Sequence, residues 1–82
     1  MDTERQLTKA RLADCRDQKE QLELQGESLL ITLRQTLDPY ADSIADLNTD
    51  RASQAMNDLY ACARELRGLN GKIRRLEEGL HG

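Results

Sequence analysis

Residues 38–50 read DPYADSIADLNTD and separate two long helix-forming segments. Pro39 is the only proline. A proline disfavours the α conformation at the residue before it but suits the first turn of a new helix. Asp38 can supply the N-cap of such a helix. We therefore expect one helix to end near Leu37 and another to begin at Pro39.

A second break is predicted at the end of this stretch. Asn48, Thr49 and Asp50 are three poor helix-interior residues in succession. Thr49 can cap a further helix whose first turn carries Asp50. Aspartates four residues apart would repel one another along a continuous helix by about 0.2 to 0.5 kcal/mol per pair. With separate helix starts, Asp38, Asp42 and Asp50 instead lie at or near N-termini, where negative charge is favourable.

The composition predicts an all-α fold. The 82 residues include no phenylalanine and no tryptophan, whereas sheets favour aromatic and β-branched side chains. Leucine, alanine, glutamate, glutamine and arginine are strong helix formers. We expect one helical domain over residues 1–82, with a helix at about 3–37, a short helix at about 39–47 and a helix at about 49–78.

The last segment has the clearest helical pattern in the chain. Its apolar residues step alternately by three and four from Ala52 to Leu80, as in a coiled coil. Gly79 stands where a C-terminal cap is expected, which predicts that the helix ends near Glu78. The residues that we expect to form an association seam are Leu59, Leu66, Leu69, Ile73, Leu76 and Leu80.

Two helices of similar length favour a long antiparallel hairpin, with the short helix at its tip. The first helix is richest in leucine near the tip, and the last helix near the open end. Opposite that open end the first helix offers only Leu7, Ala10, Leu12 and Cys15. We therefore expect a homodimeric four-helix bundle, or packing on a partner protein. The alternative is a monomeric three-helix domain completed by Met56 and Tyr60.

The cysteines and the histidine do not form a recognisable catalytic or metal site. Cys15 and Cys62 stand far apart and His81 is the only histidine. A zinc site needs three or four closely spaced ligands, and a nucleophilic cysteine needs a base within reach. Residues 38–50 also lack the central glycine of a calcium loop. We expect no enzymatic activity, no metal, no cofactor and no small-molecule substrate.

The cysteines also distinguish two registers of the hairpin. A tight turn between Asp38 and Pro39 would place Cys15 opposite Cys62. An arrangement with a third, short helix moves Cys15 toward Gly71.

The net charge of −3 lies entirely in residues 34–58, which contain five acids and two bases. Elsewhere acids and bases balance and alternate, so the charge pattern argues against nucleic-acid binding. The charged N-terminal residues lack the apolar core of a signal peptide, and no run approaches the roughly 20 apolar residues that span a bilayer. We expect a cytoplasmic protein without membrane contact, with Asp42, Asp46 and Asp50 as a candidate acidic tip for a partner.

The sequence DRASQ at residues 50–54 follows this acidic stretch, and LEEG at residues 76–79 ends the last helical segment. The arrangement resembles the coiled-coil part of DksA-type factors, which enter the secondary channel of RNA polymerase. In that family an Asp-x-x-Asp-x-Ala motif at the tip acts at the polymerase active centre. Asp50 and Ala52 match the motif, whereas Leu47 stands at its first aspartate and the family's four-cysteine zinc domain does not follow.

Three hypotheses for the function result. The first is a non-catalytic protein-interaction or structural module that self-associates or binds a partner through leucine seams. The resemblance implies the second, a small transcription regulator that contacts RNA polymerase through its acidic tip. The third is a secretion or assembly chaperone.

Overall fold

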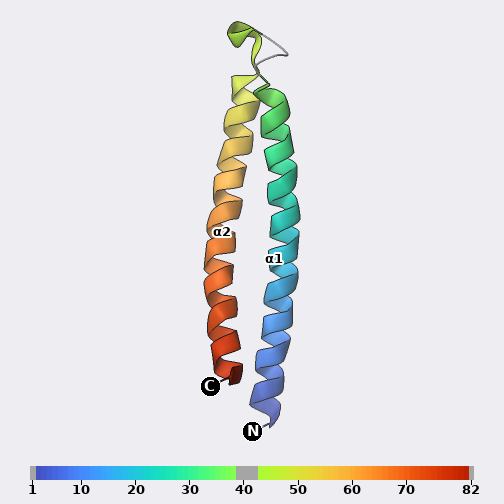
Figure 1. The fold of residues 1–82 in the computed structure, drawn as a ribbon, viewed down its shortest axis with the longest axis vertical. Helices are drawn as coiled ribbons and strands as arrows, with labels where there is room; N and C mark the ends of the chain where they lie inside the picture. Colours follow the sequence, from blue (N-terminus) through green and yellow to red (C-terminus); the bar gives the residue numbers. More distant parts are fainter. Residues whose placement is uncertain (1, 39–42, 82) are drawn as a thin grey trace.

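The computed structural model describes residues 2–38 and 43–81. They form α1 (Asp2–Thr36), a short 3-10 helix η1 (Ile44–Asp46) and α2 (Thr49–His81). α1 and α2 run antiparallel and side by side, with η1 at one end of the hairpin and both chain ends at the other (Figure 1). The molecule measures 63 × 16 × 14 Å. The predicted all-α antiparallel hairpin is confirmed.

The tip differs from the short helix that was predicted at about 39–47. Residues 39–42 lie outside the described part of the chain. The residues after them form only the three-residue turn η1, and Leu47 is already extended, with φ −63° and ψ 136°. The helical conformation at the tip is therefore limited to one 3-10 turn among the described residues.

The predicted break near Asn48 is confirmed, but the capping residue was predicted wrongly. Asn48, and not Thr49, caps α2. Its Oδ1 accepts a hydrogen bond from the Arg51 N–H at 3.1 Å, and its carbonyl accepts the Ala52 N–H at 3.1 Å. Because Leu47 is extended, Asn48 lies just outside the helix, where a short amide side chain reaches the third N–H.

The prediction that α2 ends near Glu78 is wrong, because the helix continues through Gly79 to His81. No glycine of the described residues has a positive φ, so Gly79 is an ordinary helical residue. Packing explains the extension. Leu80 packs against the cluster of buried residues at the open end, and its carbonyl accepts a hydrogen bond from Arg5 Nη2 at 3.4 Å.

The side chains between the two helices follow a heptad spacing. In α2 the predicted series from Ala52 to Leu80 is buried or half-buried throughout. In α1 the least exposed residues step alternately by four and three; they are Thr8, Leu12, Cys15, Lys19, Leu22, Gly26, Leu29, Leu33 and Thr36. Two helices cover each other on one side only, and no side chain in the described ranges is completely buried.

The register of the hairpin is the one expected for a chain with a break after its tip. A Cβ placed on Gly26 would lie 3.5 Å from the Cys62 sulfur, so these two residues face each other. Cys15 instead packs with Ile73, close to the predicted position near Gly71. The tight-turn alternative, with Cys15 opposite Cys62, is wrong.

Candidate interaction surface

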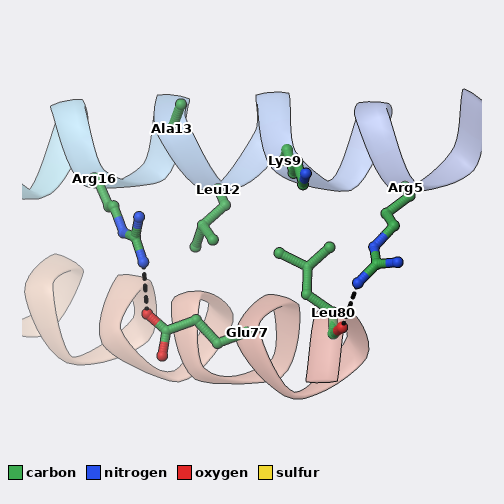
Figure 2. A pocket seen from close by; sticks show the side chains of 7 residues that line it. All are labelled: Arg5, Lys9, Leu12, Ala13, Arg16, Glu77 and Leu80. Carbon is green, nitrogen blue, oxygen red and sulfur yellow. Dashed lines mark hydrogen bonds and ion pairs between the residues drawn. The ribbon is translucent and has the colours of Figure 1, made fainter. Parts of the chain in front are cut away.

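One side of the hairpin is marked by an ion pair between α1 and α2. Arg16 Nη2 lies 3.0 Å from Glu77 Oε1, and Figure 2 shows the two side chains meeting across the groove. We call this side the Arg16 face. A seven-residue step returns to the same side of a heptad-spaced helix. In α1 the face therefore includes Lys9, Arg16, Glu23 and Leu30, and Leu37 continues it directly after the helix. In α2 it includes Met56, Ala63, Asn70 and Glu77.

These residues form layers along the hairpin. Arg16 and Glu77 make one layer. Because the helices are antiparallel, the next layer toward the tip lies seven residues later in α1 and seven residues earlier in α2. The further layers are Glu23 with Asn70, Leu30 with Ala63, and Leu37 with Met56. Leu37 continues the spacing because its N–H still bonds to the Leu33 carbonyl, at 2.9 Å. The Arg16 face thus changes from charged at the open end to apolar toward the tip.

Charged side chains line the open-end half of this face. A groove of about 610 Å³ lies between Arg5 and Arg16 of α1 and Glu77 and Leu80 of α2. Leu12 and Leu80 point into the space between the helices, and Arg5 reaches the Leu80 carbonyl (Figure 2). The side chains of Arg16 and Glu77 are 60% and 43% exposed, so their ion pair contributes little to stability.

The tip half of the Arg16 face contains an apolar groove of about 240 Å³. Gly26 helps to form this groove, because it has no side chain to occupy the space beside Cys62 and Leu59. The thiol of Cys62 uses the open space to donate a hydrogen bond to the Leu22 carbonyl, at 3.0 Å. The other lining residues are Glu23, Glu27, Leu30, Ala63 and Leu66.

Large apolar side chains lie in exposed positions at this groove and beyond it toward the tip. Leu30 and Leu37 are 41% and 48% exposed, and Met56 and Tyr60 are 52% and 62% exposed. Tyr60 follows Met56 by four residues and precedes Ala63 by three, so it lies beside both on the surface of α2. We call these five residues the apolar patch. Contiguous exposed apolar groups of this kind mark protein contact sites.

The exposed side chains that line the opposite groove of the hairpin are polar, namely Gln18, Glu65 and Lys72. The half-buried Leu22 and Leu69 and the glycine Gly68 complete its lining. Within the described ranges, none of the large exposed apolar side chains lines this groove. The two sides of the hairpin therefore differ in chemistry.

The six predicted seam residues lie between the helices. Ile73 is buried, and Leu69, Leu76 and Leu80 pack against its cluster. Leu59 and Leu66 are half-buried and also line the apolar groove. These residues hold the hairpin together, and their part in association stays a prediction.

The apolar patch was not among the predicted sites, because the leucine seam of α2 was expected to be the surface for association. A signal was present in the seven-residue spacing of Leu30 and Leu37 and in the matching spacing of Met56 and Ala63. These four residues come together only once the register of the hairpin is known.

The predicted acidic tip is described in part. Asp42 lies outside the described residues. Asp46 accepts a hydrogen bond from the Ser43 hydroxyl at 2.8 Å, and Asp50 lies in the first turn of α2. Both are exposed, and their contact with a partner stays a prediction. Residues 2–38 and 43–81 contain no group of three or more His, Cys, Asp or Glu side chains that could hold a metal ion.

Over the same residues, neither helix has a segment long and apolar enough to cross a membrane. Comparison of the chain with protein-family models, curated proteins and solved structures gave no match. The function is therefore inferred from the two faces of the hairpin.

Proposed function

We propose that this chain is a non-catalytic helical interaction module that associates with protein through the apolar patch. The observation that carries the proposal is the gathering of large exposed apolar side chains on one face. Leu30 lines an apolar groove on the Arg16 face, and Leu37, Met56 and Tyr60 follow it toward the tip, whereas the exposed side chains that line the opposite groove are polar. Leu24 and Ile31 of α1 are also exposed but line neither groove. The reducing cytoplasm is the proposed location, because the chain carries two cysteines that the register keeps too far apart to pair with each other.

Covering the apolar patch would supply a useful part of a binding free energy. Full burial of one large apolar side chain contributes about 1.5 to 3 kcal/mol, and four such side chains in the patch are roughly half exposed. The patch also lies on two packed helices, so little backbone has to be ordered when a partner binds. A specific contact with another helical surface fits these properties.

A second proposal uses the tip of the hairpin. Ile44 is 88% exposed in η1, which also carries the exposed Asp46, and Asp50 is exposed in the first turn of α2. An exposed apolar side chain and two carboxylates at one end of the hairpin suit contact with a basic partner surface, as a transcription regulator acting through its tip would require. Replacing Asp46 and Asp50 with asparagine distinguishes the proposals, because this change leaves the apolar patch intact. A transcription defect with normal folding would favour the regulator.

The interaction proposal is tested by comparing two lysine substitutions. Met56→Lys places a charge in the apolar patch. Leu24→Lys is the matched control, because Leu24 is 61% exposed on α1 but lies outside the patch. Tagged variants are used for quantitative affinity purification from the native cell, after circular dichroism has shown equal helix content.

We expect a set of proteins, untagged copies of the chain included, to be retained by the wild type and by Leu24→Lys. Met56→Lys should lose them. Equal retention by all three chains would show that the apolar patch is not an interaction surface.

A further inference from the structure

We infer that the partner of the apolar patch is a second copy of this chain, packed parallel and face to face in a two-fold symmetric four-helix bundle. This inference rests on the proposed function and adds the identity of the partner and its orientation. Three properties of the hairpin support it, namely its excess of exposed surface, the composition of its layers and the charges that flank them.

The hairpin exposes much more surface than a compact chain of its size. Its accessible area is 6710 Å², whereas a compact folded chain of 9.3 kDa exposes about 5,000 Å². The excess is about 1,700 Å², and a standard specific interface buries about 800 Å² on each partner. A second hairpin on the Arg16 face can therefore bury a standard interface and still leave the opposite, polar groove exposed.

The layers of the Arg16 face complement themselves in a parallel dimer. A two-fold axis parallel to the hairpin places α1 of one copy over α2 of the other. Each layer then lies opposite the same layer of the second copy, so that its α1 residue faces the α2 residue of that layer. Leu30 then meets Ala63 of the second copy, a large side chain against a small one. In the next layer Leu37 meets Met56. Both apolar layers are covered by apolar layers.

The charged layers also match in this arrangement. Arg16 meets Glu77 of the second copy, and Glu23 meets Asn70. Because the two-fold axis repeats every contact, each of these pairings occurs twice. No layer places like charges directly opposite each other.

The residues that flank the face give the clearest charge complementarity. Glu20 of α1 and Arg74 of α2 lie between the layers of Arg16 and Glu23. Glu27 and Arg67 lie between the layers of Glu23 and Leu30. All four are exposed. In the parallel dimer Glu27 faces Arg67 of the second copy, and Glu20 faces Arg74.

The complementarity continues between the next two layers toward the tip, where Arg34 faces Tyr60 of the second copy. An arginine over a tyrosine ring is a favourable cation–π arrangement. An antiparallel dimer in which the two hairpins overlap fully would instead lay α1 against α1, which brings Glu20 of one copy toward Glu27 of the other. Among dimers that bury the whole face, the distribution of charge therefore selects the parallel orientation.

Sedimentation equilibrium of the purified full chain under reducing conditions tests the inference. The wild type should approach twice its chain mass of 9.3 kDa with rising concentration, as should the control Leu24→Lys. Met56→Lys should remain monomeric. Glu27→Arg should weaken dimerisation roughly tenfold, because it replaces two exposed ion pairs in each dimer. Glu65→Arg, the same change on the opposite face, should leave the dimer unaffected.

The exchange Glu27→Arg with Arg67→Glu identifies the orientation. It should restore the wild-type dimer, because each reversed charge again meets an opposite charge in the second copy. Failure to restore it would overturn the parallel arrangement. A wild-type chain that stays monomeric at millimolar concentration would overturn the inference that the partner is a second copy. The retention experiment with Met56→Lys tests the interaction surface independently of this result.

Discussion

Asn48 fixes the start of α2 through a single side-chain oxygen. Its Oδ1 accepts the Arg51 N–H at 3.1 Å and thereby satisfies one of the donors left unpaired in the first turn of a helix. Asn48→Ala should lower the free energy of unfolding by about 1 kcal/mol. Urea denaturation followed by circular dichroism measures the change.

Thr49→Ala is the control for this prediction. Thr49 is already inside α2, where alanine is the better helix former. Its replacement should be neutral or slightly stabilising. A larger loss of stability with Thr49→Ala than with Asn48→Ala would mean that the helix is capped by the threonine.

Gly26 is the second residue with a testable role. A Cβ at this position would lie 3.5 Å from the Cys62 sulfur and 3.9 Å from Leu59 Cδ1, which are ordinary contact distances. Gly26→Ala should therefore raise the free energy of unfolding by about 1 kcal/mol through helix propensity, with a further gain from these contacts. Gly68→Ala, whose Cβ would meet nothing within 4 Å, isolates the propensity effect.

Both glycine variants must be compared at one protein concentration, since association changes the apparent stability. A destabilised Gly26→Ala would show that the helices approach each other more closely at this point than in the structure.

At the scale of elements, the register between α1 and α2 predicts which cysteines can form a disulfide. Cys15 and Gly26 are separated by about 16 Å along α1 at 1.5 Å per residue. Cys62 faces Gly26, so Cys15 and Cys62 are too far apart for a disulfide, which needs Cα atoms within about 7 Å. Mild oxidation of the wild type should give no intrachain disulfide.

Gly26→Cys in a Cys15→Ala background should behave in the opposite way. The Cβ of residue 26 would lie 3.5 Å from the Cys62 sulfur, which is near the geometry of a disulfide. Mass spectrometry of the unreduced proteins shows whether each of the two chains has formed an intrachain disulfide. A ready Cys15–Cys62 disulfide in the wild type would require a different register.

The sequence predicted the elements better than their contacts. The series from Ala52 to Leu80 identified α2, and the run from Asn48 to Asp50 identified the break before it, because both depend on local spacing and helix propensity. The end of α2 was predicted wrongly because the packing of Leu80 and the bond from Arg5 to its carbonyl are long-range contacts. Gly79 alone carries no information about them.

The apolar patch could not be predicted for the same reason. Leu30 belongs to α1 and Leu37 directly follows it, whereas Met56 and Tyr60 belong to α2. Only the register places these four residues on one face. The register in turn depends on the number of residues in the connection between the two helices. Asp38-Pro39 and Asn48 limit this number but do not determine it.

At the scale of the whole molecule, the shape of the chain is the feature that a partner would change most. Its radius of gyration is 18.5 Å, whereas a compact domain of this length has about 12 Å. Two helices leave half of each helix uncovered, and on the Arg16 face the uncovered part carries the apolar patch. A parallel dimer covers that face and keeps the acidic tips of both copies at one end.

The most direct test of this account is the distance between spin labels at one site in the two copies. Glu78 is exposed near the open end of α2. It is labelled as Glu78→Cys in a background with Cys15→Ala and Cys62→Ala, and pulsed electron paramagnetic resonance measures the distance. A parallel four-helix bundle of helices about 10 to 12 Å wide predicts a distance below about 40 Å. An antiparallel dimer that overlaps only the apolar patches would give about 55 Å or more at 1.5 Å per residue, and that result, or the absence of any dipolar coupling, would contradict the parallel dimer.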